Sequence, residues 1–268
     1  MPRQSSSDFV EALARGLAII TAFSPTATEL SVSDAAARTS LPRPTARRLL
    51  MTLERLGYVR SNDGVYTLTT KVLELGTTYV AALGIWELAR PHLEALVAQT
   101  GESSSMSQLD GSDIVYVARV AVPKIIAIAV HIGTRFPAVA TSMGHVLLAD
   151  LPRDELTTTL RAPSQSGIIP RVSLTRKELD HVLALVRQQG FAISDERLSL
   201  GIRSMAAPVR DASGRTVAAV NVTVHAAETS VRELKHRHLP LLLATAKNIT
   251  EEWANLARLP VPDPLERA

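Results

Sequence analysis

The feature that most constrains the fold is a short amphipathic segment, residues 43–56, with arginines on one side and apolar side chains on the other. The apolar side is formed by Ala46, Leu49, Leu50, Leu53 and Leu56. This spacing predicts a helix, and Gly57 is typical of a helix end. Two β-prone runs follow, at residues 58–60 and 65–68, on either side of Asp63-Gly64. A short turn of this kind between two such runs predicts a β-hairpin.

Two shorter helical patterns precede this segment. Apolar side chains at helical spacing form a stripe on the first of them, namely Phe9, Leu13, Leu17 and Ile20. Ser24-Pro25-Thr26 breaks the pattern. A second helix is expected from Ser33, a suitable N-cap, to Arg38, before a turn at residues 39–42. Three short helices followed by a hairpin indicate a winged helix-turn-helix, which we predict for residues 9–69.

Positive charge is concentrated on the third of these helices. Residues 38–60 contain six arginines and a single acid, Glu54, although the net charge of the whole chain is only +3. The second helix of a helix-turn-helix enters the major groove, where an arginine can donate two hydrogen bonds to guanine. We therefore predict binding to a double-stranded DNA operator. The residues expected at the DNA are Arg43, Pro44, Thr45, Arg47, Arg48 and Thr52 of the helix, and Arg60 and Asn62 of the hairpin.

A cationic helix face also has a simpler explanation, since many such faces contact only solvent. Arg55 lies near the far end of the helix and is open to a purely structural role. The order of helices, turn and hairpin within about sixty residues nevertheless favours DNA binding. The hairpin would be the wing, with Arg60, Asn62 and Tyr66 near the DNA backbone or the minor groove.

The rest of the chain is expected to form a helical linker over residues 70–84 and a second domain over residues 85–258. Pro91 is expected to open a helix or to kink a longer one. Strands are expected at residues 103–110, 114–117, 125–132, 203–209 and 217–224, and helices at residues 142–148, 176–189 and 230–257. An antiparallel sheet with flanking helices predicts an α+β fold.

Composition excludes several classes of protein. The chain has no cysteine, which rules out disulfides, thiolate metal sites and a cysteine nucleophile. Hydrophobic residues make up 46% of the chain, enough for a sizeable core, yet no stretch of about 18 apolar residues is free of charge. The polar run at residues 1–8 does not resemble a signal peptide. We expect a soluble, cytoplasmic protein without a membrane partner.

The common catalytic motifs are absent from the sequence. It contains no phosphate-binding glycine loop, no GxSxG and no HExxH. Ser142 and His145 are three residues apart, which invites a nucleophile-and-base interpretation. No third orienting group accompanies them, and a shared helix face is the commoner explanation. We expect no enzymatic activity, no metal and no cofactor.

Five segments carry a family resemblance: Ala14–Ile20, Leu41–Leu50, Leu53–Val59, Gly133–Gly144 and Ala206–Asp211. In this order and spacing the chain resembles the IclR family of bacterial regulators from about residue 9 to residue 257. The segments at residues 9–16 and 133–144 are most similar to regulators of protocatechuate and hydroxybenzoate breakdown through the β-ketoadipate pathway. The resemblance implies a GAF-like effector-binding domain, a small carboxylate effector, and a homodimer or tetramer.

The resemblance also implies an effector pocket between the sheet of the second domain and the loop at residues 133–144. The lining residues that it implies are Ser142, Met143, Asp195, Ser204, Asn221 and Thr223. Asn221 and Thr223 share a face of their expected strand, where inward polar groups need partners. Ser142 lies near a helix start, where free backbone N–H groups favour an anion.

Two arginines are candidates to meet the effector's carboxylate, Arg135 and Arg203, with His131 behind them. Simpler roles stay open for this group of residues. Arg135 would also suit an ion pair with a surface acid, and Asp195 would suit an N-cap or a loop.

Two other functions stay open at this point. One is a small-molecule sensor that acts through protein contacts alone, and the other is an IclR-type regulator of a different set of genes. Salt-dependent binding to DNA would separate operator binding from the first of these.

Overall fold

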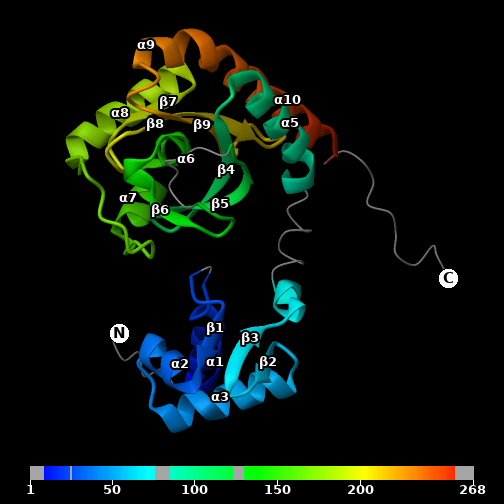
Figure 1. The fold of residues 1–268 in the computed structure, drawn as a ribbon. Coiled ribbons are helices and arrows are strands. Elements are labelled where there is room, and N and C mark those ends of the chain that lie inside the picture. Colours follow the sequence, from blue (N-terminus) through cyan, green and yellow to red (C-terminus); the bar gives the residue numbers. More distant parts are fainter. Residues whose placement is uncertain (1–8, 25, 76–84, 123–129, 257–268) are drawn as a thin grey trace, which may run out of the picture. The chain divides into compact units, whose positions relative to one another are not determined.

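The computed structural model describes residues 9–24, 26–75, 85–122 and 130–256, and Figure 1 draws these residues in colour. The chain forms two compact units, residues 1–83 and 84–268. Within the described residues, no helix combines the length and the apolar character needed to cross a membrane.

The first unit consists of short helices and a small antiparallel sheet (Figure 1). Its elements are α1 (Glu11–Thr21), β1 (Glu29–Ser31), α2 (Val32–Thr39), α3 (Arg43–Arg55), β2 (Val59–Asn62), β3 (Val65–Leu68) and the 3₁₀ helix η1 (Thr70–Leu73). The strands lie in the order β1-β3-β2. Asp63 and Gly64 join β2 to β3 with φ values of 49° and 81°. Positive φ at both positions is what a type I′ turn requires, so the predicted hairpin is confirmed. The sequence did not predict β1, because three residues are too few for a strand pattern.

The core of the first unit uses only the last residue of the apolar stripe on α1, Ile20, which packs against the core cluster. Ile19 and Phe23 are buried, whereas Phe9, Leu13 and Leu17 are 56%, 63% and 49% exposed. Helical spacing identifies an apolar face but not the surface that covers it. The stripe therefore leaves apolar area on the outside of this unit.

Local hydrogen bonds fix the helix-turn-helix. The N-cap of α2 is Ser31 rather than the expected Ser33. The Ser31 hydroxyl accepts from the Asp34 N–H (3.2 Å), and the Asp34 carboxylate accepts from the Ser31 N–H (3.0 Å). This reciprocal pair is a capping box, and its hydrogen bonds lower the pKa of Asp34. The helix α3 begins at Arg43, as expected, and Gly57 follows its end with a φ of 81°.

The second unit contains a six-stranded antiparallel sheet in the order β6-β5-β4-β9-β8-β7. Its strands are β4 (Ser103–Asp110), β5 (Asp113–Val120), β6 (Arg135–Pro137), β7 (Ala192–Asp195), β8 (Ile202–Arg210) and β9 (Thr216–His225). Its helices are α5 (Ile85–Thr100), η2 (Ala138–Ala140), α6 (Ser142–Ala149), α7 (Arg153–Arg161), α8 (Arg176–Gln189), α9 (Val231–Glu233), the π-helix η3 (Leu234–His238) and α10 (Leu239–Leu256).

Helices cover both faces of this sheet. The helices α5 and α10 contact each other and one face, and α6, backed by α8, contacts the other (Figure 1). The α6 side holds a core cluster that includes Met143, Leu148, Leu183 and Ala219. The α+β architecture is the one predicted from the sequence.

Several elements of this unit differ from expectation. The strands β6 and β7 and the helix α7 were not predicted. Pro91 lies inside α5 and does not open it. The final helix is not regular throughout, because the π-helix η3 directly precedes α10, whose second residue is Pro240. A proline lacks the backbone N–H of a regular turn, and its ring clashes with the preceding turn.

Two expectations fall largely outside the described residues. The strand expected at residues 125–132 lies mostly within residues 123–129, and residues 130–132 are not a strand. Most of the expected linker, residues 76–84, is also outside the described part, and its start is the 3₁₀ helix η1.

Candidate effector site and nucleic-acid interface

A cavity lies in the second unit between the α6 side of the sheet and the start of α6. The volume open to the centres of water-sized molecules is about 80 Å³. One row of hydroxyl side chains crosses four strands along its wall: Ser103, Thr223, Ser204 and Ser194. Each is the register partner of the next, from β4 to β9, β8 and β7. Side chains paired in this way lie on one face, so the row forms a continuous polar strip.

A second row runs beside the first and contains a cation. Arg119 of β5 pairs with Ser105 of β4, which pairs with Asn221 of β9. The Arg119 guanidinium donates to the Ser105 hydroxyl (3.1 Å). The side-chain Oδ1 of Asn221 accepts from the Ser105 N–H (2.9 Å), and its side-chain Nδ2 donates to the Thr223 hydroxyl (3.0 Å). The sheet therefore holds all three side chains in place.

Arg119 is the only arginine or lysine among the described residues that line the cavity. Burial lowers the pKa of Arg119, because desolvation disfavours its charged form. An anion in the cavity would compensate this cost and would accept charge-assisted hydrogen bonds from the guanidinium.

The start of α6 closes the cavity on the side opposite the sheet. Thr141 caps the helix by accepting from the Gly144 N–H (3.0 Å). The Ser142 hydroxyl shares a 2.8 Å hydrogen bond with the hydroxyl of Ser204 on the sheet. A side chain at position 144 would collide with η2, since an added Cβ would lie 2.0 Å from the carbonyl oxygen of Ala138. Glycine is therefore required where α6 meets η2.

Apolar and further polar groups complete the walls. The rings of Tyr116 and Phe136 meet edge to face with centroids 5.6 Å apart. Burial raises the pKa of Tyr116 to about 12, so its hydroxyl keeps its proton. Glu102 and His225 also line the cavity. The His225 Nδ1 accepts from the Ala227 N–H (3.3 Å), so Nε2 carries the proton when the ring is neutral. The cavity thus offers a cation, a carboxyl group, an imidazole, hydroxyls and aromatic surface to a ligand.

The structure brings five of the expected effector residues to the cavity, and these are Ser142, Met143, Ser204, Asn221 and Thr223. It places Arg135, Asp195 and Arg203 elsewhere. Arg135 forms ion pairs with Asp110 (2.7 Å) and Asp113 (3.5 Å).

Arg203 lies on the face of β8 opposite Ser204, because strand side chains alternate. Its guanidinium pairs with Asp195 (2.7 Å) and donates to the carbonyls of Ala226 and Thr229. His131 is exposed and is not part of the cavity wall.

Sequence reasoning missed Arg119, Ser103 and Ser194. The serine-rich run at residues 103–107 was the available signal, since hydroxyls on an inward strand face suit a polar cavity. Ser142 and His145 do not act as a pair, because Ser142 bonds to Ser204 and the His145 Nε2 donates to the Val139 carbonyl (2.8 Å).

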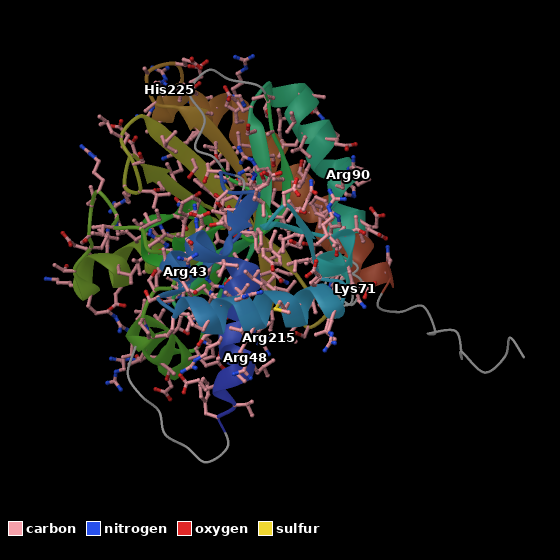
Figure 2. All side chains as sticks on the ribbon, turned by 60° about the horizontal axis from the view of Figure 1, so that its bottom comes forward. Arg43, Arg48, Lys71, Arg90, Arg215 and His225 are labelled. Carbon is pink, nitrogen blue, oxygen red and sulfur yellow. The ribbon has the colours of Figure 1, made fainter. Side chains whose placement is uncertain are left out.

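The first unit presents a cationic helix face to solvent. The side chains of Arg43 and Arg48 project from α3 (Figure 2), and that of Arg47 is also exposed. Within the described residues none of the three forms an ion pair. Pro44 is exposed on the first turn and Thr45 is half-buried. The Thr52 hydroxyl donates to the Arg48 carbonyl inside the helix (2.8 Å), although its side chain is exposed.

The wing is attached to this helix. The Glu54 carboxylate accepts from the Ser61 N–H of β2 (3.1 Å), which fixes the hairpin on α3. Arg60 is exposed and donates to the Thr67 hydroxyl (3.1 Å), and Asn62 is exposed beside the turn. Tyr66, which we expected near DNA, is instead buried in the core, because its position on the middle strand faces the helices.

Two family models match the chain. The IclR helix-turn-helix domain matches residues 12–63, and the bacterial transcriptional regulator IclR C-terminal domain matches residues 77–251. The chain belongs to the IclR family. This confirms the resemblance drawn from the sequence, and it identifies the first unit as the helix-turn-helix part of an IclR-type regulator rather than of an enzyme.

Individual IclR-family proteins match over most of the chain. The Pca regulon regulatory protein of Pseudomonas putida is 37% identical over 91% of this chain and 84% of its own length. The crystal structure of a transcriptional regulator from Rhodococcus sp. RHA1 is 47% identical, with a TM-score of 0.81 over 92% of this chain and all of that one. A double mutant of the PobR inducer-binding domain from Acinetobacter, solved with 3-hydroxybenzoic acid, is 32% identical, with a TM-score of 0.56 over 61% of this chain and 96% of that one.

Proposed function

We propose that this IclR-family regulator binds a hydroxylated aromatic carboxylate, of the hydroxybenzoate or protocatechuate kind, and controls the breakdown of such acids. The observation that carries the proposal is the position of Arg119 beside the hydroxyl row of the cavity. The name of the Pseudomonas relative and the 3-hydroxybenzoic acid held by the PobR domain support this class of effector.

The cavity suggests how such a ligand binds. Its carboxylate meets Arg119, a half-buried cation that forms no ion pair with the acids of the described residues. Its ring lies against Tyr116, Phe136 and Met143. Its ring hydroxyls exchange hydrogen bonds with the row that includes Ser204 and Thr223, since a hydroxyl both donates and accepts.

The DNA interface is the exposed face of α3 with the wing. Arg43, Pro44, Thr45, Arg47, Arg48 and Thr52 would lie at the groove, and Arg60 and Asn62 at the adjacent backbone. The exposed stripe on α1 would join two copies of the chain, because such an apolar strip is costly in water and a dimer would cover it twice. A regulator that binds chromosomal DNA in bacteria would act in the cytoplasm.

Isothermal titration calorimetry tests the effector site. The ligands are 3- and 4-hydroxybenzoate, protocatechuate and β-ketoadipate, with 3,4-dihydroxybenzyl alcohol as the analogue without a carboxylate. Arg119→Gln should weaken binding of the preferred acid by about ten- to a hundredfold, because a hydrogen bond to a charged group is lost. Binding of the alcohol should change little.

Arg135→Gln is the matched comparison, because Arg135 has its own acidic partners outside the cavity. It should leave the affinity for the acid unchanged. Loss of affinity in Arg135→Gln but not in Arg119→Gln would overturn the assignment and restore the cation that the sequence suggested. A preference for β-ketoadipate would keep the carboxylate site but replace the aromatic ligand.

Fluorescence anisotropy with duplex DNA from upstream of the genes next to this one tests the operator interface. Binding should weaken steeply with salt, since the protein displaces counterions from the phosphates. Arg43→Ala with Arg47→Ala should weaken binding about a hundredfold, because each arginine contributes roughly 1–3 kcal/mol at a guanine. Arg90→Ala on α5 is the control and should bind normally. Wild-type protein that binds its effector but no DNA would favour a sensor that acts through protein contacts.

A further inference from the structure

The cationic face of α3 contains an apolar hollow. Its lining alternates between apolar groups, Val32, Pro44 and Met51, and the arginines Arg43, Arg47 and Arg48. Arg47, Arg48 and Met51 follow Pro44 by three, four and seven positions, so the four residues share one face of the helix. Val32 is the first residue of α2 and adds the wall next to α3.

Met51 is the apolar group that most needs an explanation. Its side chain is 49% exposed in the middle of a face rich in arginine, whereas the core side of the same helix is filled by Ala46, Leu50 and Leu53. The arginines that line the hollow leave about half of the Met51 side chain exposed. The hollow is therefore open to a partner.

Charge and chemistry identify that partner. Three arginines without ion pairs among the described residues favour a polyanion, and this inference rests on the proposed binding of α3 to DNA. In the major groove, the edges of the bases carry hydrogen-bonding groups except for the 5-methyl group of thymine. This methyl group is therefore the part of a base edge that would fit an apolar hollow on a helix face in the major groove.

We propose that Val32, Pro44 and Met51 form a receptor for the methyl group of a thymine in the operator. The flexible thioether side chain of methionine suits it to close over a group of this size. The arginines around it contact guanines or phosphates on either side. The operator half-site then contains a thymine that is read by contact and not by hydrogen bonds.

Deoxyuridine substitution tests the proposal, because deoxyuridine lacks only the methyl group of thymidine. The full-length protein first selects its preferred duplexes from a random-sequence pool. Copies of the selected site are then made with each thymine in turn replaced by deoxyuridine. At one thymine in each half-site, the replacement should weaken wild-type binding by about three- to fivefold, the effect of one buried methyl group.

Variants at position 51 connect this effect to the hollow. Met51→Ala should bind the parent site three- to fivefold more weakly and should no longer distinguish thymine from deoxyuridine. Met51→Leu should keep the distinction, because it keeps apolar surface. Leu56→Ala is the control: it removes an apolar side chain that is 53% exposed on the same segment but lies outside the hollow, and it should keep the distinction.

Two results would overturn the proposal. In the first, no deoxyuridine copy binds the wild-type protein more weakly than the parent site. In the second, the loss persists unchanged in Met51→Ala. Either result leaves DNA binding by α3 intact. Failure to select any sequence from the pool would instead overturn the proposed DNA interface, and the methyl receptor with it.

Discussion

His145 is a buried histidine whose role is structural. It is fully buried in α6, its Nε2 donates to the Val139 carbonyl, and its Nδ1 has no hydrogen-bond partner in the described part of the chain. Burial, with a smaller contribution from the charge of Arg197, lowers the pKa of His145 from 6.5 to about 4. The Val139 carbonyl opposes this shift only in part. The neutral ring is therefore the form that the fold accepts.

Mild acid should destabilise the protein through this residue. The folded-state pKa is below the unfolded value, so the unfolded chain takes up the proton first as the pH falls. The contribution of the neutral His145 ring to the free energy of unfolding is complete above about pH 6.5 and is lost between about pH 6.5 and pH 4. Measured by urea unfolding, the free energy of unfolding should fall by about 2 kcal/mol more in the wild type than in His145→Gln between pH 7.5 and pH 5. His181→Gln on the exposed surface of α8 should lose as much as the wild type.

At the scale of elements, the cavity depends on the close contact between η2 and α6. This contact positions Ser142 and Met143 over the sheet. No side chain fits between the two elements at position 144, because the neighbouring atoms belong to the backbone of Ala138 and cannot move aside without moving η2.

Gly144→Ala should therefore destabilise the second unit by about 3 kcal/mol, the upper part of the usual range for overpacking, and should impair effector binding. Chemical denaturation and calorimetry measure both effects. Gly214→Ala is the control, since Gly214 has a φ of 83° but open space around it. That change should cost about 1 kcal/mol from backbone strain alone and leave the effector affinity unchanged. Equal losses in the two variants would show that the contact with Ala138 is not the cause.

At the scale of the whole molecule, the exposed stripe on α1 is the surface through which we propose that two copies of the chain associate. The side chains of Phe9, Leu13 and Leu17 are only partly covered by the described residues of their own chain. A twofold contact between two such stripes would also pair the α3 helices of two copies, and an operator with two half-sites requires such a pair.

Leu13→Glu should weaken self-association by more than tenfold, because the twofold contact would bury two unpaired carboxylates. Sedimentation velocity measures this, and binding to a two-half-site operator should fall with it. Leu185→Glu makes the same chemical change at an exposed position of α8 and should alter neither property. If the association state of Leu13→Glu matched that of the wild type, α1 would not be the contact.

The effector site shows how far the alternation of side chains along a strand predicts the face of the sheet on which each side chain lies. The pairing of β4 with β5 shifts between Met106 and Ser107, and Val117 is left without a register partner. This bulge turns Arg119 to the same face as Tyr116, although they are three residues apart on one strand. Strict alternation would place them on opposite faces. From the sequence we named Arg135 and Arg203 as the cations for the effector, and neither lines the cavity.

The sequence by itself determined the features that depend on neighbours along the chain. The cationic face of α3 follows from its helical period, and the hairpin follows from Asp63-Gly64, whose backbone conformation few other residues adopt readily. Tertiary structure decided which surfaces meet. It buried Ile19 rather than Leu13, and it turned Arg119 into the cavity through a bulge. The physical reason is that periodicity records the faces of an element, whereas burial depends on partners that lie far away in the sequence.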